Sequence, residues 1–382
     1  MRYDFDKIVN RRGTNCYKYD EMPNNDTIAL WVADMDFETA PCVLDALKKR
    51  MEHGCFGYTK VPDSFYQATI DWFSRRHGWQ GIKKEWFIYT SGVVPAVSAI
   101  IKAMTQPGDK VLLHTPAYNC FFSSIRNNDC HIERIGVFED IEAKCSDPSV
   151  KVLLLCNPHN PTGHVWTEDE LTHIADVCQK HNVFVIADEI HCEFINPSYG
   201  KKYIPFATIA DKVNADGNGE KLKYAVCLSP TKAFNIAGLQ IANIICPDNS
   251  IRRRIDRAIN INEVCDVNPF GVIALQAAYT AEGEEWLTQL NEYIYANYDY
   301  AKAFIEEHFP TWKVTPLEAT YLMWVEVGTD ADRLCKEILD NCNVYINPGS
   351  MYGDNSFIRI NLATQRARLE EALNRIAAWR KR

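Results

Sequence analysis

The sequence predicts an α/β protein with a parallel sheet covered by helices on both faces, followed by a smaller α+β domain. First, the middle of the chain alternates short β-branched runs with helical stretches, which is the pattern of strand–helix–strand units. Second, these runs are apolar at consecutive positions, as in strands buried on both faces. Third, the pattern changes at Asn268, after which strands and helices follow at shorter spacing.

Six strands are expected in the middle of the chain, over residues 110–114, 131–137, 151–155, 183–187, 225–228 and 241–246. Helices are expected between them, over residues 92–104, 117–127 and 168–181. The last of these starts after Thr167, and Glu170 stands three residues on, which forms the sequence pattern of a capping box.

The C-terminal part is expected to contain helices over residues 269–281, 284–308, 330–341 and 364–379, and strands over residues 312–315, 321–327 and 357–361. The first 40 or so residues lack a strong period, and we expect them to pack across both domains. These expectations divide the chain into an N-terminal arm (1–45), a large domain (46–280) and a small C-terminal domain (281–382).

Composition excludes several classes of protein. Of the 382 residues 47% are hydrophobic and 24% charged, which rules out a disordered chain, a collagen-like chain and a coiled coil. A net charge of −9 argues against nucleic acid as a partner. No charge-free apolar stretch is long enough to suggest a membrane span, and the first residues lack the apolar region of a signal peptide. The 14 cysteines include no C-x-x-C pair, so we expect a cytoplasmic protein with reduced thiols and no bound metal.

Lys232 is the first candidate for chemistry, in the segment Ser229–Asn235 (SPTKAFN) after an apolar strand. A lone lysine is nearly always a solvated surface charge, but small and apolar neighbours would lower the pKa of this amine. A desolvated lysine amine can form a Schiff base with an aldehyde. The segment also matches S-x-x-K of serine β-lactamases, but the partner triplets S-D-N and K-T-G are absent.

Three further segments place polar groups where ligands bind. Asp188 stands at the carboxyl end of an apolar strand, where it either caps the next helix or faces a protonated ring nitrogen of a cofactor. Asn160 lies in a loop of two Asn-Pro turns, which either punctuate a loop or hold its amide towards a ligand. The segment Thr90–Val94 opens a helix, whose free amides suit a phosphate.

Together and in this order, the four segments resemble the fold type I family of pyridoxal-phosphate (PLP) enzymes, the aspartate aminotransferase superfamily. Within it, the chain is most similar to the PatB/MalY-type carbon–sulfur lyases, through Trp31–Phe37 (WVADMDF), Thr90–Pro95, Asp188–His191 and the lysine segment. The resemblance runs through nearly the whole chain, as far as Phe357–Asn361. It implies a large domain with a mostly parallel seven-stranded sheet between helices, and a smaller C-terminal α+β domain.

The resemblance also implies residue roles around the cofactor. Lys232 would hold PLP as a Schiff base and move the Cα proton, and Asp188 would keep the ring nitrogen protonated. The remaining cofactor contacts would come from Asn160 at the phenolic oxygen, Tyr118 on the ring face, Gly92, Val93, Val94 and Ser229 at the phosphate, His191 near the ring, and Tyr58 of the neighbouring subunit. Arg359 would clamp the substrate carboxylate, with Ala33 and Asn160 beside it.

Two positions depart from the aspartate-type aminotransferases that the chain resembles. His191 stands where those enzymes carry a tyrosine, which is characteristic of the lyase-like branch. Gln240 stands where they often carry an arginine that pairs with the phosphate, so phosphate binding would rest on amides, hydroxyls and the helix dipole.

The resemblance therefore implies a homodimeric PLP enzyme of amino-acid metabolism, with methionine biosynthesis as the expected setting. It would cleave L-cystathionine or a related cysteine S-conjugate to a thiol, pyruvate and ammonia. An aminotransferase that uses the same residues is the alternative. A third hypothesis, from another class, is a partner-binding protein with secondary PLP chemistry. No motif places a second cation for the side-chain carboxylate of an aspartate substrate.

Overall fold

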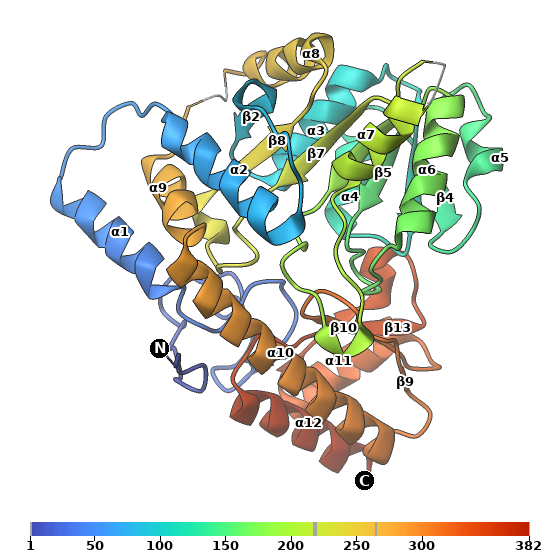
Figure 1. Cartoon of the computed structure of the whole chain (residues 1–382). Coiled ribbons are helices and arrows are strands. Elements are labelled where there is room, and N and C mark those ends of the chain that lie inside the picture. The colour runs from blue at the N-terminus through green and yellow to red at the C-terminus, as the bar shows by residue number, and fades with distance from the viewer. Residues whose placement is uncertain (1, 217–219, 264–265, 382) are drawn as a thin grey trace.

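The computed structural model describes residues 2–216, 220–263 and 266–381, and a seven-stranded mixed sheet forms the centre of its larger part (Figure 1). The strand order is β2-β8-β7-β6-β5-β3-β4. The strands are β2 (Phe87–Thr90), β3 (Lys110–Thr115), β4 (His131–Gly136), β5 (Val150–Cys156), β6 (Phe184–Asp188), β7 (Tyr224–Leu228) and β8 (Ala242–Ile245). All six strands expected in the middle of the chain are present, and the predicted α/β class is confirmed.

The sheet differs from the expectation at one side. The five strands from β4 to β7 are parallel to their neighbours, whereas β8 pairs antiparallel with both β7 and β2. The strand expected over residues 241–246 is therefore not part of a purely parallel sheet. β2 has only four residues, three of them half-buried, so its sequence lacks the continuous apolar run that marks the central strands.

Helices cover both faces of this sheet, as predicted. One apolar core joins the sheet to α3 (Val93–Met104), α4 (Asn119–Arg126) and α8 (Asn249–Asn260). The core on the other face includes side chains of α2 (Asp63–His77), α6 (Glu168–Lys180), α7 (Phe206–Asp216) and α9 (Pro269–Ala278), beside the short α5 (Glu142–Cys145). The capping box before α6 is confirmed, because Thr167 accepts from the Glu170 amide and Glu170 accepts from the Thr167 amide.

A second sheet, of four strands in the order β12-β13-β10-β9, lies at the other end of the molecule (Figure 1). Its strands are β9 (Lys313–Val314), β10 (Leu322–Glu326), β12 (Asn347–Pro348) and β13 (Phe357–Asn361), all antiparallel. The helices of this part are α11 (Ala331–Cys342) and α12 (Arg366–Arg380). The long α10 (Ala281–His308) contacts α12, α9 and β9, and so runs along both parts.

The first 40 residues lie between the two sheets and contact elements of both parts. β1 (Ile28–Ala29) pairs with β11 (Val344–Tyr345), and the Met35 amide donates to Asn235 in the loop after β7. The chain then forms α1 (Pro41–Glu52), which projects from the body together with the loop that follows it (Figure 1). Over the described residues, no helix is both long and apolar enough to cross a membrane.

Candidate active site

The carboxyl ends of four neighbouring strands form the base of the candidate site. β3, β5, β6 and β7 stand side by side in the order β7-β6-β5-β3, so the loops that follow them meet at one edge of the sheet. In the strand register, Asp188 lies opposite Cys156 on one side and Cys227 on the other, which brings these three strand ends level. Ligands of open α/β sheets bind at this edge.

Lys232 follows β7, and its amine lies in a desolvated position. Nζ donates to the Ala33 carbonyl oxygen at 2.5 Å, which links the loop to the N-terminal segment. Burial lowers the pKa of the Lys232 amine to about 8, with Arg359 also lowering it, while Asp34 and Asp188 oppose this shift. A larger fraction of the amine is therefore neutral, and hence nucleophilic, near neutral pH than for a solvated lysine.

Asp188 ends β6, and its carboxyl group is fully enclosed without an ionic partner among the described residues. Burial raises the pKa of Asp188 to about 7, although the Ile190 amide donates to Oδ1 at 3.1 Å. Nearby, burial lowers the pKa of His191 to about 3, so this imidazole is neutral, and its Nδ1 has no partner in the described structure. A buried carboxylate without a partner is costly, and a cationic ligand group would remove that cost.

Arg359 reaches the site from β13 of the other sheet. Its guanidinium donates to the Trp31 carbonyl at 3.0 Å and to Asn160 Oδ1 at 3.4 Å, and it lies over the Tyr352 ring at 4.4 Å. Its Nε has no partner in the described structure, and the residue is only 3% exposed. The structure thus brings Arg359 and Asn160 together and leaves donor capacity on the arginine for an anion.

The other expected cofactor contacts lie around this centre. Tyr118 caps α4 and packs edge-to-face on Phe121. Gly92 precedes α3, and no side chain caps the helix start formed by Val93 and Val94, so the first amides stay available. Ser229 donates its hydroxyl hydrogen to the Ile241 carbonyl at 2.6 Å, and its oxygen lies 2.7 Å from the Thr231 hydroxyl.

Tyr58 is not brought to these residues. Its side chain is 97% exposed, in the irregular segment between α1 and α2. Gln240 is also exposed, in a left-handed turn with φ of 49°.

Sequence reasoning missed Tyr321 and the role of the backbone in the segment Trp31–Phe37. The Tyr321 hydroxyl donates at 3.0 Å to the same Ala33 carbonyl that accepts from Lys232. Asn361 donates to the Val32 and Asp34 carbonyls, which holds this segment against β13. Tyr321 opens a strand-like run and stands in no motif, so nothing in the sequence marked it.

The acidic residues of that segment support it rather than face the site centre. Asp36 is fully buried and forms ion pairs with Lys18 at 3.1 Å, Arg11 at 3.1 Å and Arg368 at 3.3 Å. Burial opposes ionisation, but the cations and the Thr364 hydroxyl hold the pKa of Asp36 below its usual range. This network fixes the backbone whose carbonyls hold Lys232 and Arg359.

The groups left unsatisfied here match those of PLP. An aldehyde needs the desolvated amine of Lys232, and a protonated ring nitrogen needs the unpaired carboxylate of Asp188. A phosphate needs free amides such as those at the start of α3. The residues present therefore fit this cofactor.

Comparison with known proteins gives consistent similarities. Residues 25–376 match the family model described as aminotransferase class I and II. The chain is 37% identical over 394 aligned residues to cystathionine beta-lyase PatB of Bacillus subtilis, which covers 98% of this chain and 99% of PatB. A PLP-bound putative aminotransferase of Clostridium difficile is 39% identical with a TM-score of 0.91, covering 98% of this chain and 99% of that one. The PLP-bound C-S lyase of Staphylococcus hominis is 31% identical with a TM-score of 0.88, covering 98% of both chains.

Proposed function

Because the chain belongs to the aminotransferase class I and II family, we propose that it is a PLP-dependent carbon–sulfur β-lyase. It cleaves L-cystathionine or a related cysteine S-conjugate, with water, to a thiol, pyruvate and ammonia. The observation that carries the proposal is the placement of Lys232, Asp188 and Arg359 at one sheet edge, each with the unsatisfied group that this chemistry uses. The names of the similar proteins, PatB and the S. hominis lyase, support the same reaction.

The residues of the chain divide the work as follows. PLP, when bound, supplies an electron-poor ring that stabilises the negative charge left at the substrate Cα after proton loss. Arg359 holds the substrate α-carboxylate, and its planar guanidinium fixes the orientation of Cα. Lys232 takes the proton from Cα, because its lowered pKa leaves part of the amine neutral. Asp188 holds the positive charge at the ring nitrogen.

Three other residues position or shield the centre. Asn160 would donate its amide hydrogens to the cofactor while its Oδ1 accepts from Arg359. Tyr118 would cover one face of the ring, and the neutral His191 would stand beside it without adding positive charge. Gly92, Val93 and Val94 would bind the phosphate with backbone amides, and Ser229 would stand next to it.

An aminotransferase is the second candidate, because the C. difficile structure of 39% identity is titled a putative aminotransferase. The two functions differ in the fate of the carbanion, which either expels a thiolate from Cβ or is reprotonated on the cofactor. Purified holoenzyme should release pyruvate and a free thiol from L-cystathionine without any 2-oxo acid. L-Aspartate with 2-oxoglutarate should give kcat/KM lower by about a hundredfold or more, equivalent to roughly 2.7 kcal/mol. Turnover that requires an added 2-oxo acid and releases no thiol would establish the aminotransferase instead.

The cofactor assignment is tested by reduction with borohydride and peptide mapping. We expect PLP to be fixed on Lys232 alone, and the Lys232→Ala variant to lose both the label and the lyase activity. A label on another lysine would contradict the assignment.

We also propose a homodimer in the cytoplasm, in which Tyr58 completes the phosphate site of the neighbouring subunit. The exposed apolar side chains Met51 (62%), Phe56 (52%) and Tyr58 (97%) on α1 and the loop after it support such an interface. Mixing a Tyr58→Phe variant with Lys232→Ala should restore part of the activity, since hybrid dimers contain one intact site. A stable monomer with full activity would refute this role.

A further inference from the structure

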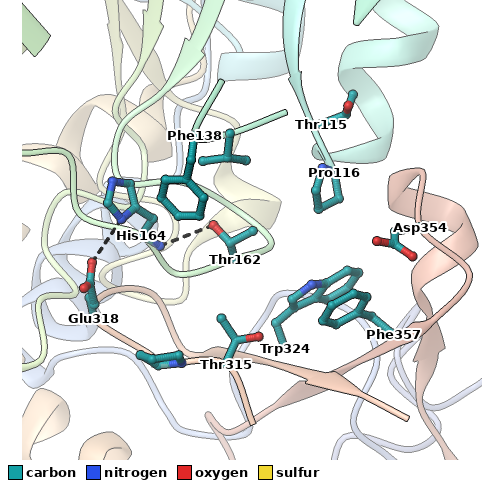
Figure 2. Close-up of a pocket in the computed structure, with 12 residues that line it drawn as sticks. Thr115, Pro116, Phe138, Thr162, His164, Thr315, Glu318, Trp324, Asp354 and Phe357 are labelled. Atoms are coloured by element: carbon teal, nitrogen blue, oxygen red, sulfur yellow. Dashed lines mark hydrogen bonds and ion pairs between the residues drawn. The ribbon is translucent and has the colours of Figure 1, made fainter. Parts of the chain in front are cut away.

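A cavity of about 310 Å³ lies between the two sheets, beside the catalytic centre and outside the residues assigned to it. Its upper wall comes from the ends of β3 and β4, with Thr115, Pro116 and Phe138 (Figure 2). Its lower wall comes from the second sheet, with Trp324 and Phe357. The volume lies in the range of small-molecule sites.

The walls of the cavity are aromatic and apolar. Trp324 and Phe357 stack with their ring centroids 5.0 Å apart and their planes within 6°. Phe138 is 76% exposed at the rim, and its ring packs edge-to-face on His164 at 5.1 Å. Three aromatic rings around one opening provide the electron-rich faces that attract organic cations.

The charges that line the cavity are acidic, and one of them is uncompensated. The charge of Glu318 is taken up by Lys201 at 2.7 Å and by His164 at 3.2 Å. Asp354 instead receives only the Ser356 amide and hydroxyl, both at Oδ1, and forms no ion pair with any described residue. Figure 2 shows Asp354 beside the Trp324–Phe357 pair, across the opening from Thr162.

An anionic ligand has no partner here. The lining contains neither lysine nor arginine, and the one basic residue, His164, has both ring nitrogens beside carboxylates, Glu318 and Glu170 at 3.2 Å. Burial also lowers the pKa of His164, so its ring carries less charge than a solvated imidazole. The cavity therefore disfavours amino acids, whose carboxylate would be unpaired, and is distinct in chemistry from the substrate site at Arg359.

We propose that this cavity binds a small organic cation, with its charge facing Asp354 and its apolar part against Phe138, Trp324 and Phe357. The site is connected to the catalytic centre through side chains. Trp324 pairs with Arg359 in the register of β10 and β13, and its ring packs edge-to-face on Tyr352, over which the Arg359 guanidinium lies. A cation in the cavity thus sits two aromatic rings away from the substrate clamp.

The test uses borohydride-reduced holoenzyme and benzyltrimethylammonium, a quaternary cation that forms no Schiff base. In a titration followed by ligand NMR, the cation should bind at one site, at least about threefold more tightly than benzyl alcohol, and phenylacetate should not bind. The variants Asp354→Asn and Phe138→Ala should each weaken binding by at least about threefold. Asp354→Asn keeps an acceptor for Ser356, and truncating the exposed Phe138 leaves the core intact.

Asp340→Asn is the matched control, since it removes an exposed carboxylate of α11 outside the cavity, and it should bind the cation as the unaltered enzyme does. A crystal soaked with the 4-bromobenzyl analogue should show bromine between Pro116 and Trp324. Equal affinity in Asp354→Asn, binding of phenylacetate as tight as that of the cation, no measurable binding, or bromine at Lys232 would each overturn the proposal. Because binding is measured directly, these outcomes do not depend on the lyase reaction.

Discussion

Replacing Asp188 by asparagine should stabilise the cofactor-free protein above neutral pH, although it removes the group proposed to charge the cofactor. The carboxyl group is fully enclosed in the interior, has no ionic partner among the described residues, and its pKa is raised to about 7 by burial. In the unfolded chain the same group ionises near 3.8. Between these values the folded protein keeps a proton that the unfolded chain releases, so stability falls as pH rises through this window.

The size of the effect follows from this difference. About 3 pKa units at about 1.4 kcal/mol each give a penalty of about 4 kcal/mol at pH 8, and about 2 kcal/mol at pH 5. Asparagine removes this penalty and keeps an acceptor for the Ile190 amide, but its NH₂ group lacks a partner, at a cost of about 1–3 kcal/mol. The net gain is about 1–3 kcal/mol at pH 8 and close to zero at pH 5.

The measurement is thermal unfolding of both proteins after removal of PLP, at pH 5 and pH 8. We expect the variant to melt roughly 2–5 °C higher at pH 8 and at nearly the same temperature at pH 5. With PLP bound, the difference should reverse, because the ring nitrogen then pairs with the carboxylate of the unaltered enzyme. If Asp188→Asn melts lower than the unaltered protein at pH 8 without cofactor, the carboxyl group is not the uncompensated charge argued for here.

Three further changes test the residues around the centre. Arg359→Lys should lower kcat/KM by about ten- to a hundredfold, mainly through KM in steady-state kinetics, because an ammonium makes no bidentate pair with a carboxylate; an unchanged KM would contradict the clamp. Tyr321→Phe leaves the Ala33 carbonyl to Lys232 alone and should raise the pKa of that amine by up to about one unit, seen in the pH dependence of its acylation without cofactor; no shift would show that the shared carbonyl is unimportant. Asp36→Asn should cost about 3–5 kcal/mol of stability in urea unfolding at pH 7. That difference should shrink as pH falls through the lowered pKa of Asp36, and a constant difference would contradict the ion-pair network.

The sequence by itself determined the central sheet and most of the candidate site. Runs such as Val150–Cys156 are apolar over nearly their whole length, and only a strand buried on both faces has that pattern, so local sequence was sufficient. Asp188 and Lys232 follow such strands directly, and neighbouring parallel strands end at the same edge. Their meeting therefore follows from the strand order alone.

The tertiary structure decided what depends on contacts between distant residues. The antiparallel direction of β8 is a property of its partners, since a strand of one sequence can pair either way. Tyr321 meets Lys232 at the Ala33 carbonyl across 288 and 199 residues, and a backbone oxygen carries no sequence signal. The cavity at Asp354 likewise takes its walls from β3, β4, β10 and β13, and only the packing of the two sheets leaves its carboxylate without a cation.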